Sequence, residues 1–171
     1  ALQMAKESLQ HIQATVDDYE ALFVKRCRVD GVLSDMTYAK VKIRNRKVKD
    51  GTLVTPMATY INFLKPTAVR GREVLWVEGK NNGNLIAHET GLKGMINVNL
   101  DPNGYLAMRG QRHPITKIGM EHLAAELIRK AQRDRNHDEC QVQFYNDAKV
   151  GKSVCTMLEV THPVKRSQRG R

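Results

Sequence analysis

The spacing of apolar residues predicts a helix in two parts of the chain. Within residues 2–16, apolar side chains recur every three or four positions and leave polar side chains on the opposite side. A longer helix is predicted for residues 115–134, with Thr116 as a candidate N-terminal cap and Gly119 as a weak point in the first turn. Its apolar stripe comprises Met120, Leu123, Ala124, Leu127, Ile128 and Ala131. Each helix therefore needs an apolar surface to cover.

Between these helices, apolar and polar residues alternate in short runs, which is typical of β-strands. The predicted strands are residues 19–29, 36–46, 52–64, 73–78, 85–88 and 95–100. Asp30-Gly31 and Asp50-Gly51 are typical of tight hairpin turns. Lys65-Pro66 ends the third of these strands, because proline has no N–H group for a strand ladder.

After the second helix, residues 140–145 and 154–161 are predicted to form a last hairpin. Turn-forming residues between its strands are Asn146, Asp147 and Gly151. A turn centred near residues 149 and 150 places Cys155 opposite Phe144 rather than opposite Cys140, so a Cys140–Cys155 disulfide would need a bulge or a shifted register. The chain has three cysteines, and the sequence leaves the disulfide and the redox compartment open.

The order of helix, strands, helix and two strands predicts an α+β fold in which one face of an antiparallel sheet takes both helices. The length of 171 residues suits one domain with its own core. We expect this domain to span residues 1–161 and to be followed by a basic tail, residues 162–171. No apolar run approaches the roughly 18 residues that a membrane-spanning helix needs.

The net charge of +10 comes from two segments of the chain. Residues 25–50 contain nine basic and three acidic residues, and residues 161–171 contain four basic residues and no acidic one. The rest of the chain carries 15 residues of each sign. The basic character is therefore local, and the isoelectric point alone would hide that.

Four basic residues line one side of the second predicted strand. They are Lys40, Lys42, Arg44 and Arg46. Alternate residues of a strand share a face, so these charges would stand about 6.8 Å apart in a line, with Ala39, Val41 and Ile43 on the other side. The line is either a solvated surface that opposes aggregation or a contact for a polyanion such as nucleic acid, an acidic glycan or lipid headgroups. Base-stacking aromatic residues are not interleaved with it, which disfavours a nucleic-acid reader.

No group of residues has the spacing of a familiar catalytic or metal centre. The chain lacks a Gly-x-Ser-x-Gly motif and His or Cys pairs at metal-binding spacing. Gly151-Lys152-Ser153 lacks the first glycine and the strand-to-helix context of a phosphate-binding loop. His137-Asp138-Glu139-Cys140 alternate between strand faces and cannot all meet one ion. Cys27, between Arg26 and Arg28, is either a buried apolar residue or a reactive thiolate. We therefore expect that the protein is not an enzyme and that it binds neither a cofactor nor a metal ion.

Several stretches carry a resemblance to a known family. They are Asp18-Tyr19, Val24-Lys25-Arg26, Arg28-Val29-Asp30-Gly31, Phe63-Leu64-Lys65-Pro66, Gly71-Arg72-Glu73-Val74-Leu75, Leu106-Ala107-Met108-Arg109-Gly110, His113-Pro114-Ile115-Thr116 and Val160-Thr161-His162-Pro163. With these stretches the chain resembles, over nearly its whole length, a bacterial family of unknown function, domain of unknown function 1571. None of the stretches is a catalytic signature.

More distantly, the order of elements is similar to the LolA/LolB lipoprotein carriers, whose curved antiparallel half-barrel wraps around helices and holds acyl chains on its concave face. The resemblance implies a half-barrel fold and export to the periplasm or another compartment of the bacterial envelope. In the family, further strands follow the His-Pro pair that stands here as His162-Pro163. We expect residues 162–171 to be either the truncated start of such strands or a disordered arm that binds an anion.

The resemblance also implies an apolar concave face. Its expected residues are Val41, Ile43, Met57, Ile61, Phe63, Trp76, Leu123 and Leu127. In the strand around Trp76, either Val74 and Trp76 or Leu75 and Val77 would point to this face. These residues form either a ligand cavity or an ordinary filled core.

Two hypotheses of function follow. The first is a non-enzymatic binding protein of the bacterial envelope that holds an acyl chain or another apolar ligand between sheet and helices, while the basic line orients it towards an anionic surface. The second is a structural or interaction protein that binds a polyanion through its basic strand or pairs its open sheet edge with a partner chain.

Overall fold

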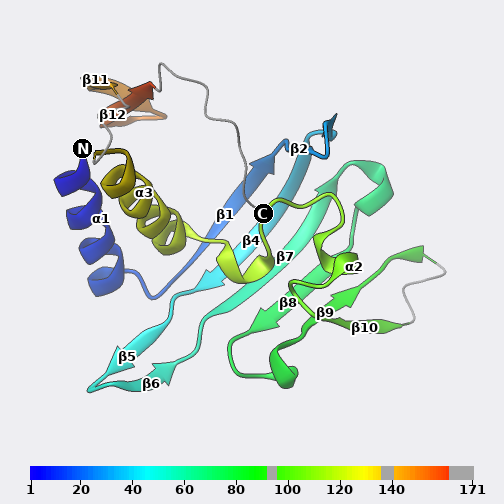
Figure 1. Ribbon diagram of the computed structural model, residues 1–171. Coiled ribbons are helices and arrows are strands. Elements are labelled where there is room, and N and C mark those ends of the chain that lie inside the picture. The colour runs from blue at the N-terminus through cyan, green and yellow to red at the C-terminus, as the bar shows by residue number, and fades with distance from the viewer. Residues whose placement is uncertain (92–95, 136–140, 162–171) are drawn as a thin grey trace. The chain divides into compact units, whose positions relative to one another are not determined.

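The computed structural model describes residues 1–91, 96–135 and 141–161, and Figure 1 shows their helices and strands. The basic tail and the segment His137-Asp138-Glu139-Cys140 lie outside the described residues, so the predictions made for them are not addressed.

Contacts divide the chain into two compact units. We call residues 11–123 the sheet unit, and residues 1–10 together with 124–171 the hairpin unit. Helices α1 (Leu2–Thr15) and α3 (Met120–Arg135) contribute residues to both units. The expectation of one domain stays a prediction.

Six antiparallel strands form the main sheet of the sheet unit, in the order β1-β4-β7-β8-β9-β10 (Figure 1). They are β1 (Asp18–Lys25), β4 (Thr37–Arg44), β7 (Ala58–Lys65), β8 (Glu73–Val77), β9 (Leu85–His88) and β10 (Asn97–Leu100). Strands β1 and β10 are the two edges, so this sheet is not closed into a barrel. The predicted α+β fold with a large antiparallel sheet is confirmed.

The alternation along β4 gives this sheet an inner and an outer face. The buried, inner-face residues of β4 are Ala39, Val41 and Ile43. The exposed, outer-face residues are Lys40, Lys42 and Arg44. Directly opposed residues of antiparallel strands share a face, so Val41 continues the inner face to Ala21 of β1 and Ile61 of β7. The predicted division of this strand into an apolar and a basic side is confirmed.

The core lies on the inner face around β4. Its buried cluster consists of Ala39, Val41, Ile43 and Ile61. Partly buried side chains packed against it are Tyr19, Phe23, Met57, Phe63, Val74, Ile115 and Ile118. Ile115 opens the 3₁₀ turn η4 (Ile115–Lys117), so the segment just before α3 covers this part of the sheet. Two further 3₁₀ turns are η1 (Thr67–Val69) and η2 (Asn81–Gly83).

Both Asp-Gly pairs form hairpin turns, as predicted. Asp30 and Gly31 join β2 (Arg28–Val29) to β3 (Val32–Leu33), and Asp50 and Gly51 join β5 (Lys47–Lys49) to β6 (Thr52–Thr55). All four turn residues have positive φ, between 49° and 81°. This backbone twist matches that of paired strands, which explains the Asp-Gly signal.

Two predicted strands are each divided in the structure. The strand predicted at residues 19–29 becomes β1 and β2, because Arg28 and Val29 leave the sheet to pair within their own hairpin. The strand predicted at residues 52–64 becomes β6 and β7 on either side of Pro56, which has no N–H group to donate.

The helix predicted at residues 115–134 is present, but it begins five residues later than predicted, and its end agrees to within one residue. Helix α3 begins at Met120, and Thr116 lies in η4 rather than at the helix cap. Gly119, directly before the helix, has φ +122°, outside helical geometry. A short helix, α2 (Tyr105–Met108), lies between β10 and η4.

The hairpin unit contains the antiparallel pair β11 (Gln141–Val150) and β12 (Ser153–Thr161). The pairing extends to Val150 opposite Ser153, so the turn consists of the two residues between them. The register shifts between Tyr145 and Ala148. Cys155 therefore faces Ala148, and the predicted opposition to Phe144 is wrong, because the turn lies later than expected. The Cys155 thiol is free.

Candidate ligand-binding site

The structure brings together most of the apolar residues predicted for a ligand site, but as a packed core. Val41, Ile43 and Ile61 are buried members of the core cluster, and Met57 and Phe63 pack against it. Around β4 these side chains pack against one another and against the η4 segment rather than facing solvent.

The other three predicted residues are not among the side chains that form this cluster. Trp76 is half-buried on the inner face opposite Thr59, and its indole N–H donates to the Gly83 carbonyl at 3.2 Å. Leu123 and Leu127 of α3 are 60% and 53% exposed. The predicted site residues are therefore divided between a filled core and exposed positions.

The four predicted anion-contact residues differ in their surroundings. Lys42 forms an ion pair of 2.7 Å with Glu20, and Arg46, beyond the end of β4, forms one of 2.9 Å with Glu78. The Arg44 guanidinium donates to the Pro56 carbonyl at 3.2 Å. Exposed pairs of this kind are weak, typically about 0–1 kcal/mol, and a polyanion could compete for them. Lys40 is also exposed on the outer face, nearer the N-terminal end of β4 than Lys42 and Arg44.

The charges of the outer face also act on one another. The hydrogen bond between Lys42 and Glu20 lowers the pKa of the carboxyl and raises the pKa of the ammonium group. On β7, the Tyr60 hydroxyl donates to Glu73, and this bond raises the pKa of the phenol. On the outer face, Lys42 therefore belongs to a local charge pair rather than to a bare row of cations.

An exposed apolar cluster, which the sequence analysis did not single out, lies at the β10 edge of the sheet. Ile96, Val98 and Leu100 alternate along the chain and so share one side, and Leu100 pairs with the buried Leu85. Helix α2 adds Tyr105 and Leu106. The exposed fractions are 65% for Ile96, 40% for Val98, 81% for Tyr105 and 66% for Leu106. We call these five residues the β10 cluster.

A hollow of about 240 Å³ lies at one end of this cluster, and its lining also includes Asn99, Asp101, Gly104 and Ala107. Leu100 of β10 lines it together with Tyr105 and Leu106 of α2. The sequence contains a Pro-Asn-Gly turn directly before Tyr105 and Leu106. It does not indicate that this turn brings the two side chains back beside β10. Clustered exposed apolar residues of this kind mark interaction or ligand sites more often than scattered ones do.

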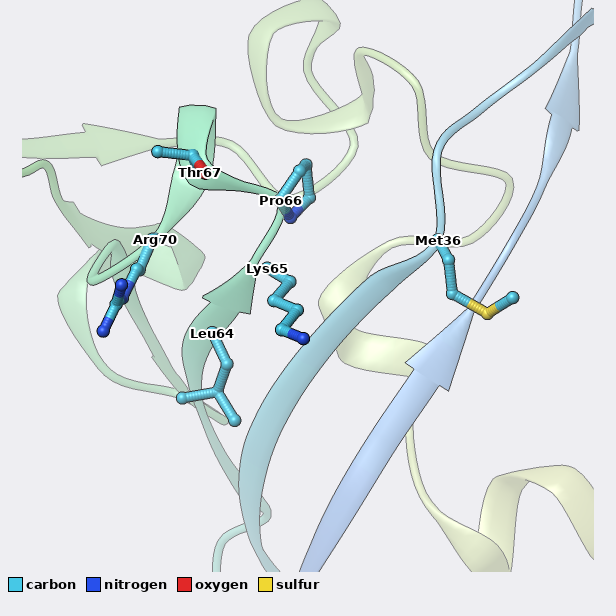
Figure 2. A pocket seen from close by; sticks show the side chains of 6 residues that line it. All are labelled: Met36, Leu64, Lys65, Pro66, Thr67 and Arg70. Atoms are coloured by element: carbon cyan, nitrogen blue, oxygen red, sulfur yellow. The ribbon is translucent and has the colours of Figure 1, made fainter.

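A second, larger hollow of about 530 Å³ lies where β7 ends (Figure 2). Its lining residues are Met36, Leu64, Lys65, Pro66, Thr67 and Arg70. We call it the β7 hollow. None of the residues predicted for the apolar or the anion site lines either hollow.

Buried ionisable groups occur on the inner face near β1. Burial lowers the pKa of Lys25, whose ammonium group donates to the Gln111 side chain. Burial likewise raises the pKa of Tyr19, against the opposing effect of its hydrogen bond from Met120. The Cys27 thiol is free and half-buried. Within the described residues, no three His, Cys, Asp or Glu side chains gather so that they could hold a metal ion.

The fold and these sites define an α+β protein with an open antiparallel sheet and two surface hollows. Residues 16–170 match the family described as "Protein of unknown function (DUF1571)", and the chain belongs to that family. The family resemblance seen in the sequence is thus confirmed. No helix of the described part is long and apolar enough to span a membrane.

One solved structure that is similar to this chain is a DUF1329 family protein from Desulfovibrio piger ATCC 29098. The match has a TM-score of 0.48 and 16% sequence identity, and it covers 95% of this chain and 60% of that one. The chain therefore spans less than two thirds of the protein that it matches. No curated protein matches the chain.

Proposed function

We propose that this protein is a non-enzymatic binding protein that takes up the apolar chain of a lipid, or another apolar ligand, at the β10 cluster. The observation that carries the proposal is the exposure of four large apolar side chains at the β10 edge, two of which, Tyr105 and Leu106, line a hollow of about 240 Å³. Covering such a surface releases about 25 cal/mol per Å² of apolar area. The ligand would extend the inner face of the sheet beyond β10.

The core around β4 supports this location rather than the one expected from sequence. Val41, Ile43 and Ile61 are already buried by their neighbours, so a ligand there would have to displace the η4 segment. At β10 the apolar side chains need no displacement to receive a ligand, because they are already exposed. Pre-formed sites avoid the free-energy cost of reorganisation.

Titration with the neutral apolar dye Nile red tests the proposal. The double variant Val98→Asp with Leu106→Asp should weaken dye binding at least tenfold, because two carboxylates would enter the apolar surface. Val32→Asp, at an exposed apolar position of the β2–β3 hairpin, is the matched control and should bind like the original protein. Circular dichroism checks that each variant folds. No dye binding, or equal loss in the control, would overturn the proposal.

We further propose, on the family resemblance, that the protein works in the bacterial envelope. Cell fractionation of the full gene product, with a periplasmic and a cytoplasmic marker enzyme, tests this location. Recovery with the periplasmic or membrane fraction supports it, and recovery with the cytoplasmic marker overturns it.

A second candidate function is an interaction protein. The observation that favours it is the outer face of β4, where Lys40, Lys42 and Arg44 follow one another at every second position. A polyanion bound there releases counterions, so its affinity for heparin should fall steeply as salt rises. Replacing Lys40 and Lys42 by Gln should flatten that salt dependence, and heparin binding that ignores salt would exclude this function.

Strand pairing is the other form of this interaction function. Strand β1 is a sheet edge of eight residues with the exposed apolar side chains Leu22 and Val24, and its ladder to β4 is free of bulges. Regular, exposed edges of this kind can pair with another chain. Light scattering would show an assembly that Leu22→Lys dissociates, and a monomer at all concentrations would argue against it.

A further inference from the structure

We propose that the β7 hollow is a separate binding site for an oxyanion carried on a short alkyl chain, such as an alkyl phosphate or a fatty carboxylate. The proposal does not depend on the function assigned to the β10 cluster. It rests on the volume of the hollow, about 530 Å³, and on the residue types that line it. That volume is within the range of pockets that hold small ligands, about 300–1,000 Å³.

The sequence builds this hollow by ending β7 and turning the chain back. Pro66 follows the last residue of β7, and η1 reverses the direction so that Arg70 returns towards the strand. Two backbone hydrogen bonds close the loop: Gly71 N–H donates to the Phe63 carbonyl at 2.7 Å, and Phe63 N–H donates to the Arg72 carbonyl at 2.9 Å.

Contacts with neighbouring segments hold the closed loop in place. The Thr90 hydroxyl donates to the Arg70 carbonyl at 3.2 Å. A Cβ atom at Gly71, which has φ +82°, would stand 2.8 Å from the Thr90 methyl carbon, so only glycine fits. The wall of the hollow is therefore built before any ligand arrives.

The lining of the hollow carries two cations and no acidic residue. Figure 2 shows the side chains of Lys65 and Arg70 extending away from one another, on opposite sides of Leu64. The Lys65 ammonium also lies 5.6 Å from the centre of the Tyr38 ring, a cation–π contact that restrains it. Neither Lys65 nor Arg70 forms an ion pair with another residue of the part of the chain that the structure describes. An oxyanion bound in the hollow would supply a counter-charge for Lys65 or for Arg70.

The remaining lining residues select an anion that carries an alkyl group. Thr67 offers a hydroxyl that can donate to an oxyanion. Met36, Leu64 and Pro66 present apolar surface beside the cations, and Met36 is substantially exposed. A bare inorganic anion would leave this surface in water, whereas an alkyl chain would cover it.

Calorimetric titration with three probes tests the assignment: hexyl phosphate, inorganic phosphate and hexanol. We expect hexyl phosphate to bind at least tenfold more tightly than either of the others. The double variant Lys65→Met with Arg70→Met should lose at least tenfold of that affinity. The matched control, Lys80→Met with Lys117→Met, removes the same charge from two other exposed positions and should change it less than twofold.

Each alternative outcome overturns the proposal. Equal affinity for inorganic and hexyl phosphate would show a site for free anions, and equal affinity for hexanol and hexyl phosphate would show an apolar site without anion recognition. Equal losses in the variant and its control would show attraction by net charge alone. Because the Val98→Asp, Leu106→Asp protein should still bind hexyl phosphate, failure here is distinguishable from failure of the proposed function.

Discussion

The backbone N–H of Met120 donates a hydrogen bond to the phenolic oxygen of Tyr19 at 2.8 Å. Met120 is the first residue of α3, and the first amides of a helix have no acceptor within the helix. Tyr19 stands on the inner face of β1, opposite Ile43. A side chain 101 positions earlier in the chain thus supplies the acceptor that a local cap would normally supply.

Replacing Tyr19 by Phe should remove this acceptor and keep the ring in the core. The unpaired amide should lower the free energy of unfolding at pH 7 by about 1 kcal/mol. Urea denaturation monitored by circular dichroism measures the change. An unchanged midpoint would mean that solvent satisfies the Met120 amide equally well.

The same variant should alter the response to alkaline pH. Burial, aided by the charge of Glu121, raises the pKa of Tyr19 despite the bond from Met120. The unfolded chain therefore ionises this tyrosine near pH 10 while the folded chain holds it neutral, so stability falls as pH rises above about 10. In Tyr19→Phe this part of the fall should be missing, and the stability difference between the two proteins should shrink from pH 9 to pH 11. A constant difference would contradict the raised pKa.

Gly119 should tolerate a side chain poorly. At φ +122°, a Cβ atom there would lie 3.2 Å from the Tyr19 hydroxyl oxygen and 3.6 Å from Ile43. Gly119→Ala should therefore cost about 2–3 kcal/mol, from both backbone strain and crowding. Gly79→Ala is the control, because Gly79 also has positive φ but no neighbour within 4 Å, and it should cost about 1 kcal/mol. Equal costs would show that crowding around Tyr19 has no effect.

These residues explain why the sequence misplaced the start of α3. The apolar spacing continues upstream of Met120, since Ile115 and Ile118 are also apolar, and periodicity alone does not distinguish a helix from a 3₁₀ turn. Only the acceptor on Tyr19 and the backbone angle of Gly119 fix the boundary. Both depend on tertiary contacts with β1, which no local pattern contains.

The strands, in contrast, were predictable because their signals are local in the sequence. Alternation along residues 37–44 and the two Asp-Gly turns are local signals, and the structure follows them. The candidate site was less predictable, because alternation shows which residues point inward but not what covers them. Val41 and Ile43 are covered by Ile115 and other inner-face residues, whereas Val98 is left exposed.

The buried hydroxyl of Thr59 leads to a fourth prediction. Thr59 lies on the inner face between Ile43 and Trp76, is fully buried, and its oxygen has no hydrogen-bond partner among the described residues. Such a group loses its solvation without compensation, so Thr59→Val should raise the free energy of unfolding by about 1 kcal/mol. Thr59→Ala, which leaves a gap instead, should lower it. A destabilised Val variant would indicate that the hydroxyl has a partner after all.

Truncation of Ile43 distinguishes a core residue from a ligand contact. Ile43 is 3% exposed within the core cluster, so Ile43→Ala should cost about 2–5 kcal/mol from lost burial and the cavity left behind. Its neighbour Arg44 points to the outer face, where its hydrogen bond to the Pro56 carbonyl is exposed, and Arg44→Ala should cost less than about 1 kcal/mol. Dye binding at the β10 cluster should be the same in both variants under conditions in which both are folded. If Ile43→Ala abolished dye binding and left stability unchanged, the inner face at β4 would be the ligand site, and the packing of the η4 segment over it would have to open.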